Sequence, residues 1–347
     1  MEFSKILIYW YLKNKRDLPW RNTSDPYKIW LSEIILQQTR VAQGLPYYHK
    51  FLDNFPTVNH LADASTEKVM KLWQGLGYYS RARNLHETSI YVSRELNGLF
   101  PSTYKELIKL KGIGDYTASA IASSGFGEPV AAVDGNVFRV LARYFGVDTP
   151  VNSTKGLKEF KAISQELLDN EDPRDYNQAI MEFGAVHCKP QNPLCMSCPF
   201  ANSCFAFNNN LITTLPVKNK KGKIKERYFN YLVFKTRNNT TSLEKRTGKG
   251  IWQGLYQFPL IETDDHLEIP EFLNQERFKQ LTGKDLKRVT LFNQTPITHK
   301  LTHQHIHTRF WIIEKATIDD PVLVNNINDY PVPVLIANFI NEYDFSY

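Results

Sequence analysis

The sequence lacks long hydrophobic runs, and its apolar stretches fall far short of the roughly 20 residues that cross a bilayer. The segment from Met1 to Leu12 mixes Glu2 and Lys5 with aromatic residues, which is not a signal-peptide pattern. Internal repeats and low-complexity tracts are missing as well. These absences exclude a membrane protein and a repeat protein, and we expect a cytoplasmic globular protein.

The overall composition is that of an ordinary globular protein, with 42% hydrophobic and 22% charged residues. A chain of 347 residues is long enough for two domains, each with its own core. The net charge of +6 and the isoelectric point of about 8.9 are compatible with nucleic-acid binding. Because that isoelectric point falls just short of the roughly 9 typical of nucleic-acid-binding domains, charge alone does not decide the function.

Residues 1–212 are predicted to be almost wholly helical. Asp25 and Pro26 are typical of a helix N-cap followed by proline at the first helical position. We expect the helix that follows to cover Tyr27–Val41, because apolar residues recur at helical spacing, namely Tyr27, Trp30, Leu31, Ile34 and Ile35. The same periodicity predicts further helices at 67–75, 82–95, 103–110, 116–123, 136–145, 157–168 and 175–186.

The character of the sequence changes after residue 213. Residues 214–227 hold six basic residues against one acidic residue and no sustained apolar period, which indicates a linker or an exposed basic arm. A proline-started helix near the C-terminus and three strand-like runs are predicted beyond it, at Val334–Asn341, Tyr228–Lys235, Val289–Phe292 and His303–Glu314. We therefore expect an all-α domain at 1–213 and a smaller α+β domain at 228–347.

All four cysteines of the chain are clustered. Six residues separate Cys188 from Cys195, two separate Cys195 from Cys198, and five separate Cys198 from Cys204. Four thiolates so close together can surround one compact centre, and the spacing by itself allows an iron–sulfur cluster or a tetrahedral zinc ion. A disulfide framework is not expected in a cytosolic chain, which leaves the two metal centres as alternatives.

Gly112 and Gly114 lie in a short segment between two expected helices. These glycines permit a tight turn and a close approach of the backbone to a ligand. The free N–H groups near Asp115 and Tyr116, at the start of the next helix, can bind an anion such as a phosphate. A plain helix–turn–helix corner is the alternative, since glycine also serves geometry alone.

Two carboxylates, Glu33 and Asp134, lie where acid–base chemistry could use them. Cleavage of an N-glycosidic bond, for example, requires an acid at the leaving base and a carboxylate near the developing sugar cation. Glu33 lies within the apolar helix, so it is either a buried acid or a residue of the solvated face. Asp134 precedes the helix expected at 136–145, so a helix N-cap is its structural alternative.

Five segments resemble, in order, the MutY family of adenine DNA glycosylases, which belongs to the endonuclease III-like enzymes. They are PYKIWLSEIILQQTRV, GLGYYSRARNLH, LKGIGDYTASAIAS, VDGNVFRVLAR and the cysteine loop, and the likeness covers about residues 15–210. The resemblance implies a helix-hairpin-helix domain that contacts the DNA backbone at Gly112 and Gly114, and a [4Fe–4S] cluster on the four cysteines. It also implies that Glu33 is the catalytic acid, and that Asn136 supports Asp134, the second carboxylate.

The same resemblance assigns further residues to contacts with DNA. The positions that surround adenine are Trp20, Arg21, Leu36, Gln178 and Met181. The positions that wedge into the duplex beside the lesion are Gln38, Thr39, Leu76 and Tyr78. Residues 228–347 resemble the MutT-like domain that recognises 8-oxoguanine, most clearly in GIWQGLYQFP at 250–259. Where the family has Phe-Ser-His, this chain has Leu301-Thr302-His303, so Thr302 and His303 keep the hydroxyl and the imidazole while the aromatic residue is lost.

The implied enzyme is a monofunctional glycosylase that removes adenine opposite 8-oxoguanine or guanine from double-stranded DNA, and we expect it to act as a monomer. The adenine would be flipped out of the duplex. Glu33 would then have to donate a proton, although a free glutamate with a pKa of about 4.3 is protonated about once in 500 molecules at pH 7. Burial must therefore raise the pKa of Glu33, while Asp134 stays ionised and Tyr116 helps to stabilise the sugar cation.

Two alternative functions are weighed against this interpretation. An endonuclease III-type lyase acting on oxidised pyrimidines shares the fold, but that family carries a Schiff-base lysine two residues after the second hairpin glycine. This chain has Tyr116 there, and Lys111 precedes the first glycine. A non-catalytic sensor of DNA damage would have no need of Glu33, Asp134 and Asn136.

Histidines recur in the second domain, at His299, His303, His305 and His307. We find no cysteine nearby and no carboxylate in register, so we interpret them as residues of a strand face rather than as metal ligands. A Nudix-type cluster of glutamates for pyrophosphate hydrolysis is also missing. The second domain is therefore expected to read the lesion rather than to act as a second enzyme.

Overall fold

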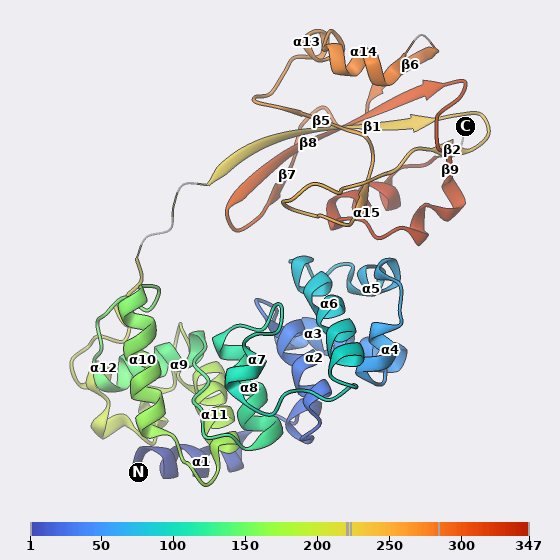
Figure 1. Cartoon of the computed structure of the whole chain (residues 1–347). Coiled ribbons are helices and arrows are strands. Elements are labelled where there is room, and N and C mark those ends of the chain that lie inside the picture. Colours follow the sequence, from blue (N-terminus) through green and yellow to red (C-terminus); the bar gives the residue numbers. More distant parts are fainter. Residues whose placement is uncertain (1, 220–221, 223, 284, 346–347) are drawn as a thin grey trace. The chain divides into compact units, whose positions relative to one another are not determined.

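The computed structural model describes residues 2–219, 222, 224–283 and 285–345. It divides into two compact units, which are Met1–Asp63 with Asn84–Lys220, and Ala64–Arg83 with Lys221–Tyr347 (Figure 1). The first unit is helical, and the second is built around a β-sheet, as the sequence predicted. No helix among the described residues is long and apolar enough to cross a membrane.

The first unit is a helical assembly in which α2 packs against both α3 and α8, and α11 packs against α1, α8 and α9. Its helices are α1 (Glu2–Asn14), α2 (Pro26–Leu36), α3 (Val41–Asn54), α4 (Val58–Ala62), α7 (Tyr104–Leu107), α8 (Asp115–Phe126), α9 (Gly135–Phe145), α10 (Thr154–Leu167), α11 (Pro173–Glu182) and α12 (Phe205–Asn208). Helix α6 (Ser80–Glu95) begins in the second unit and ends in the first. A π-helical turn, Phe183–His187, continues α11 into the cysteine loop.

Two aspartates begin helices of this unit. Asp25 caps α2 by accepting a hydrogen bond from the backbone N–H of Tyr27 at 2.9 Å, as expected. Asp134 caps α9 in the same way, and it accepts hydrogen bonds from the N–H groups of Asn136 and the residue after it. The structural alternative for Asp134 is therefore correct, and it also holds the carboxylate in one place at the positive end of α9.

Helix α2 is shorter than the sequence predicted. It ends at Leu36 instead of reaching Val41, where α3 begins. Gln38 between the two helices adopts a positive φ of 56°, which an α-helix cannot contain, and the N–H of Thr39 donates to the C=O of Leu36. After the break, Gly44 of α3 packs so close to α2 that a Cβ there would come within 2.8 Å of the Leu36 side chain.

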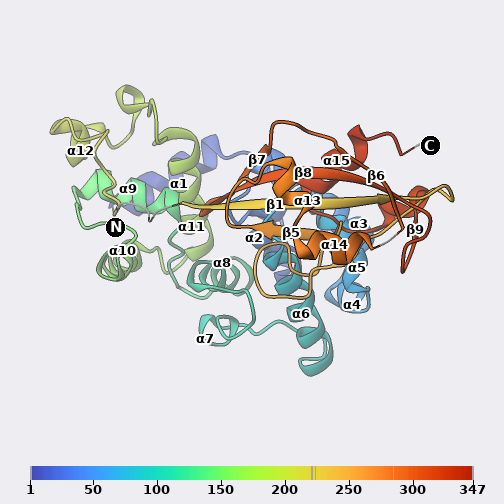
Figure 2. The same cartoon turned by 90° about the horizontal axis from the view of Figure 1, so that it is seen from above.

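The sheet of the second unit has the strand order β5-β1-β8-β6, with β7 also paired to β8. These strands are β1 (Lys225–Lys235), β5 (Leu260–Thr263), β6 (Leu286–Leu291), β7 (Ile297–Lys300) and β8 (Gln304–Lys315). The long strands β1 and β8 run parallel and side by side, whereas β5, β6 and β7 pair antiparallel with them (Figure 2).

Helices cover both faces of this sheet. In Figure 1, α13 (Ile269–Leu273) and α14 (Glu276–Thr282) lie on one side of it and α15 (Val334–Glu342) lies on the other. Further elements of the unit are α5 (Thr66–Trp73) and two small antiparallel pairs, β2 (Thr240–Thr241) with β9 (Val322–Leu323) and β3 (Glu244–Lys245) with β4 (Tyr256–Gln257). The short strands and α13 and α14 were not predicted, because segments of two to seven residues carry too little periodicity.

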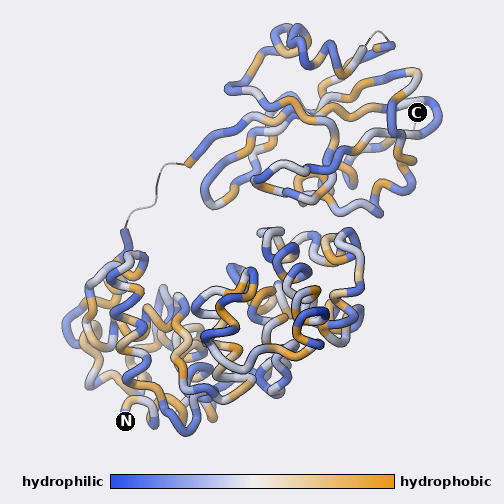
Figure 3. The backbone as a smooth tube through the Cα atoms, viewed as in Figure 1, coloured by the Kyte–Doolittle hydropathy of each residue, from blue (hydrophilic) through white to orange (hydrophobic). Residues whose placement is uncertain are grey.

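Each unit has its own hydrophobic core. In the helical unit, Leu141 of α9 and Ile180 of α11 are fully buried in a cluster shared with α1. In the second unit, hydrophobic residues gather in the later halves of β1 and β8 (Figure 3), and Phe272 of α13 stacks on Trp311 with ring centroids 4.4 Å apart. Burial of such side chains stabilises each unit by about 1.5–3 kcal/mol per residue.

The basic segment at 214–227 is partly structured. Leu215 is buried, and the C=O of Val217 accepts a hydrogen bond from the N–H of Val151. At its other end, Lys225–Arg227 belong to β1, because they pair with the first residues of β8. Residues 220, 221 and 223 of the expected linker lie outside the described residues.

Candidate active site

One pocket of about 660 Å³ in the helical unit is formed by the end of α2, the starts of α8 and α9, and one side of α11. It brings together most of the residues that the sequence analysis singled out in this unit. The predicted residues that line it are Trp20, Arg21, Glu33, Leu36, Gln38, Thr39, Tyr116, Asp134, Asn136, Gln178 and Met181. These residues come from five separate segments, so only the fold makes them neighbours.

Glu33 is a buried acid rather than a residue of the solvated face, since only 7% of it is exposed. Burial raises the pKa of Glu33 from its ordinary 4.5 to about 7. A hydrogen bond with the Tyr116 hydroxyl opposes this rise, while the negative charge of Asp134 adds to it. A large fraction of the Glu33 side chains therefore carries a proton at neutral pH, as the sequence analysis required.

Tyr116 lies between the acid and the far wall of the pocket. Its hydroxyl shares a hydrogen bond with Glu33 and lies 3.3 Å from the sulfur of Met181. Burial and the nearby carboxylates of Glu33 and Asp134 raise the pKa of Tyr116 well above its ordinary value. The hydroxyl thus keeps its proton and can only donate it to a neighbour or accept a further hydrogen bond.

Asp134 is held by a short series of hydrogen bonds. The Asn136 amide donates to Asp134 Oδ2 at 2.7 Å, and the Asn136 backbone N–H donates to Oδ1 at 2.8 Å. Burial raises the pKa of Asp134, and these donors oppose that rise. Arg139 in turn donates to Asn136 Oδ1 at 2.8 Å and to the backbone C=O of Cys188 at 2.7 Å. The carboxylate orientation is therefore tied to the start of the cysteine loop.

A further acid, which none of the sequence motifs singled out, lines the same pocket. Glu182 is almost fully buried, and its carboxylate accepts hydrogen bonds from Arg16 at 2.6 Å and from Arg21 at 2.7 Å. Burial alone would raise the pKa of Glu182, but these arginines outweigh it and lower the pKa to about 2. Arg21 also donates to the Gln178 amide oxygen at 3.2 Å. The spacing could have revealed Glu182, since it follows Gln178 by four residues on one helical face.

The hairpin before α8 is separate from the residues that line the pocket. Gly112 has φ of +76°, and a Cβ there would come within 2.7 Å of Asn84, so only glycine fits this turn. Gly114 precedes α8 without a side-chain cap. The Asp115 carboxylate accepts a hydrogen bond from Tyr104 at 2.7 Å and is paired with a lysine of α10. The first backbone N–H groups of α8 can therefore still meet an anion.

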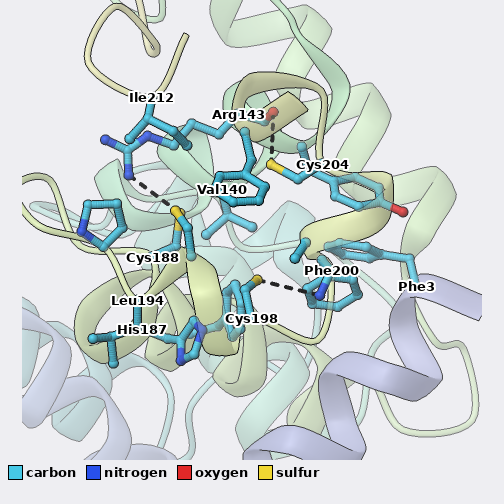
Figure 4. A pocket seen from close by; sticks show the side chains of 16 residues that line it. Phe3, Val140, Arg143, His187, Cys188, Leu194, Cys198, Phe200, Cys204 and Ile212 are labelled. Carbon is cyan, nitrogen blue, oxygen red and sulfur yellow. Dashed lines mark hydrogen bonds between the residues drawn. The ribbon is translucent and has the colours of Figure 1, made fainter. Parts of the chain in front are cut away.

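The four cysteines are free thiols that line a single cavity, whose walls are mostly apolar (Figure 4). Arg143 Nη1 lies 3.5 Å from Cys188 Sγ, and the backbone N–H of Phe200 lies 3.4 Å from Cys198 Sγ. The Cys204 thiol lies 3.5 Å from the C=O of Arg143. Within the described chain, no three His, Cys, Asp or Glu side chains are arranged around one metal-ion position.

A second pocket of about 410 Å³ lies in the other unit. It is lined by Leu76 and Tyr78 from the GLGYYS segment and by Thr302 and His303 from the turn before β8. The Tyr78 hydroxyl and Thr302 Oγ1 are 2.6 Å apart. Tyr78 is half exposed and has φ of +47°, whereas Leu76 is buried. The structure thus places four of the predicted DNA-contacting residues together.

The histidines of β8 have a carboxylate in register, which corrects the expectation that none was present. Glu226 of β1 lies opposite His305 of β8. Its carboxylate is 3.2 Å from Nδ1 of His305 and 2.7 Å from Nε2 of His307. The parallel pairing of β1 with β8 makes this contact, and it is not visible in the sequence. His299 lies on β7 with its ring 5.7 Å from Trp252. The histidines on these strands are thus strand-face residues, as the sequence analysis proposed.

Comparison with known proteins agrees with the fold. The model of the HhH-GPD superfamily of base excision DNA repair proteins matches residues 31–167, and a NUDIX domain model matches residues 230–342. A thermostable thymine-DNA glycosylase superposes with a TM-score of 0.56 at 29% identity, covering 60% of this chain and 96% of that one. Endonuclease III in a DNA complex shares the fold, with a TM-score of 0.52 at 22% identity over 60% of this chain and 97% of its own. The protein is a base-excision DNA glycosylase.

Relatives in sequence narrow this class. Adenine DNA glycosylase of Buchnera aphidicola subsp. Baizongia pistaciae is 36% identical over 317 residues, which covers 90% of this chain and 86% of that protein. Human adenine DNA glycosylase is 45% identical over 213 residues, which covers 59% of this chain and 39% of the human protein. The chain belongs to the adenine DNA glycosylase family.

Proposed function

We propose that this protein hydrolyses the N-glycosidic bond of adenine mispaired with 8-oxoguanine or guanine in double-stranded DNA, and that it acts as a monomer in the cytoplasm. The observation that carries the proposal is the burial of Glu33 beside Tyr116 and Asp134 in one pocket, with a Glu33 pKa of about 7. A carboxylic acid whose pKa lies near neutral pH can protonate a leaving base. The pocket volume of about 660 Å³ suits a flipped nucleoside.

Glu33 donates a proton to the imidazole ring of the flipped adenine, which makes the base a better leaving group. The hydroxyl of Tyr116 holds the Glu33 carboxyl in place, since the two share a hydrogen bond. As the glycosidic bond breaks, positive charge develops on the sugar, and the Asp134 carboxylate stabilises it. Asn136 supports this role, because its amide and N–H fix both Asp134 oxygens. Water completes the hydrolysis.

The protein is proposed to be monofunctional. A lyase needs an amine that forms a Schiff base with the sugar, and lysines supply it in the related lyases. Tyr116 occupies that position, and the described residues that line the pocket include no lysine. The chain should therefore release adenine and leave an abasic site without cutting the strand.

The walls of the pocket select the base. Trp20, Leu36 and Met181 provide flat or apolar surfaces, and Arg21 fixes Gln178 through its amide oxygen. Since that oxygen accepts from Arg21, the amide N–H groups of Gln178 are free to donate to ring nitrogens of the base. Glu182 and its two arginines keep this wall rigid.

Residues of both units are proposed to contact the rest of the duplex. We assign the DNA backbone to the hairpin at Gly112 and Gly114, where α8 offers free N–H groups. We assign the neighbourhood of the base opposite adenine to Gln38, Thr39, Leu76, Tyr78, Thr302 and His303. On this proposal residues 1–213 excise, residues 228–347 read the lesion, and residues 214–227 connect them.

We propose that the cysteine cavity holds a [4Fe–4S] cluster on Cys188, Cys195, Cys198 and Cys204. A cluster takes each thiolate at a separate iron, and the cavity presents four sulfurs from one loop. The Arg143 guanidinium and the N–H of Phe200 stand near two sulfurs, where they would balance the negative charge of the cluster. When bound, the cluster would crosslink the loop, and no bond-breaking step passes through it.

The deciding experiment uses purified protein and a duplex with adenine opposite 8-oxoguanine, followed by alkali, which cuts the strand at abasic sites. Strand cutting should depend on alkali and should disappear in Glu33→Gln. Glu95→Gln is the matched control, because Glu95 is an exposed glutamate at the end of α6. Cutting before alkali, or equal activity in Glu33→Gln, would refute the proposal.

A further inference from the structure

The turn between α2 and α3 holds a residue in a conformation that needs support. Gln38 has φ of 56°, in the left-handed region that residues other than glycine rarely adopt. Such a conformation persists only where its surroundings hold it. The turn lines the proposed active-site pocket with Gln38 and Thr39, the same residues that are proposed to approach the base opposite adenine.

Hydrogen bonds and packing define this turn on the side of α2 and α3. The N–H of Thr39 donates to the C=O of Leu36 at 3.1 Å, and its hydroxyl lies 3.4 Å from the C=O of Gln37. Gly44 of α3 packs against it so closely that a Cβ would lie 2.8 Å from Leu36. These contacts hold Gln37 and Thr39, the residues on either side of Gln38.

Gln37 also reaches the other side of the pocket. Its amide Nε2 lies 3.2 Å from Thr117 Oγ1, a contact between residues 80 positions apart. Thr117 is 2% exposed in α8, and it directly follows Tyr116, whose hydroxyl bonds Glu33. The side chain of Gln37 therefore connects the turn that faces the DNA with the helix that carries a partner of the acid.

We propose that Gln37 is a positioning residue that couples recognition of the base opposite adenine to the placement of Tyr116 beside Glu33. This inference rests on the function proposed above. Contact of 8-oxoguanine with the turn fixes the positions of Gln38 and Thr39. Because the side chain of Gln37 contacts Thr117, fixing the turn also restricts the movement of α8. Tyr116 on α8 is then held beside Glu33, in the geometry that excision needs. Rates are sensitive to such placement, since small displacements of reacting groups cost large factors.

The test uses Gln37→Ala and Thr117→Val, which each remove one partner of the contact, and Thr117→Ser, which keeps the hydroxyl. Single-turnover excision rates are measured with adenine opposite 8-oxoguanine and opposite guanine. Dissociation constants are measured on the same duplexes carrying 2′-fluoroadenosine, because the fluorine suppresses formation of the sugar cation. Thermal unfolding of each variant reports whether it folds.

We expect the ratio of the two excision rates, opposite 8-oxoguanine and opposite guanine, to fall about fivefold in Gln37→Ala and in Thr117→Val. This factor corresponds to the loss of one neutral hydrogen bond. The ratio of dissociation constants should stay within about twofold, and Thr117→Ser should behave as the unaltered protein. If Thr117→Val fails to fold, Gln37→Ala alone carries the test. If Gln37→Ala fails to fold, Thr117→Val carries the test and Gln37→Glu takes the place of Gln37→Ala.

Three results would overturn the inference. If the excision rates opposite 8-oxoguanine and opposite guanine fall by the same factor, Gln37 is a purely structural link between α2 and α8. An unchanged rate ratio would remove Gln37 from recognition, and a parallel loss in the ratio of dissociation constants would mean that the turn reads the base without coupling to Tyr116. If the unaltered protein itself does not excise adenine opposite 8-oxoguanine, the proposed function fails, which is a different outcome.

Discussion

Replacing Glu33 by glutamine should stabilise the protein while it abolishes excision. The glutamine has nearly the same shape and can still bond Tyr116, but it never ionises. In the folded protein the pKa of Glu33 rises from 4.5 to about 7, chiefly because the carboxyl is buried. At about 1.4 kcal/mol for each pKa unit, ionising this buried group costs the folded state about 3.5 kcal/mol.

The sign of the effect follows from proton binding. Because the folded state binds the proton more tightly than the unfolded chain, the unaltered protein loses stability as the pH rises from about 4.5 to about 7. Glu33→Gln removes this loss. The difference in unfolding free energy between the variant and the unaltered protein should therefore grow by about 2.5 kcal/mol between about pH 5 and about pH 9.

Urea denaturation of the two proteins at both pH values measures this difference, with circular dichroism as the signal of the helical unit. Glu182→Gln is the control of opposite sign, since two arginines lower the pKa of Glu182 to about 2 and its loss leaves them without their partner. That variant should be less stable at neutral pH, by about 3 kcal/mol. A Glu33→Gln difference that does not change with pH would refute the burial argument.

Four further changes test the assignments. Cys198→Ser should lower the iron content from roughly four per chain, and full iron or stoichiometric zinc would contradict the cluster. Tyr116→Lys should gain lyase activity, seen as a borohydride-trapped protein–DNA adduct, and its absence would count against this position. Asp134→Asn should nearly abolish excision yet bind duplex within about threefold, because asparagine still caps α9; near-native rates would remove Asp134 from the chemistry. Thr302→Ala, which loses the contact with Tyr78, should lower the preference for 8-oxoguanine over guanine about fivefold, and an unchanged preference would exclude Thr302 from reading.

Much of the helical unit could be predicted from local sequence, because helix signals are local. The cap at Asp25, the period of α2 and the glycines of the hairpin each act within a few residues. The cap at Asp134 was also visible, whereas the pattern of the sequence left Glu33 either buried or on the solvated face. Burial depends on what packs against a helix, so the periodicity of one strongly apolar helix could not assign the face of Glu33.

The second unit was harder to predict, because its sheet is built from distant pairings. The parallel pairing of β1 with β8 joins segments about 80 residues apart and places Glu226 between His305 and His307. No local pattern encodes such a register. The extension of β1 back to Lys225 has the same cause, since those residues become a strand only beside β8.

The sequence by itself determined the chemistry of this protein, in the sense that its motifs supplied the acid, the second carboxylate, the tyrosine and the four thiols. Only the tertiary structure decided how those groups behave. Packing around α2 raises the pKa of Glu33, while two arginines from the N-terminal segment meet Glu182 on α11 and lower its pKa. Both shifts arise from desolvation and from charges brought together by the fold, which have no counterpart in the order of residues along the chain.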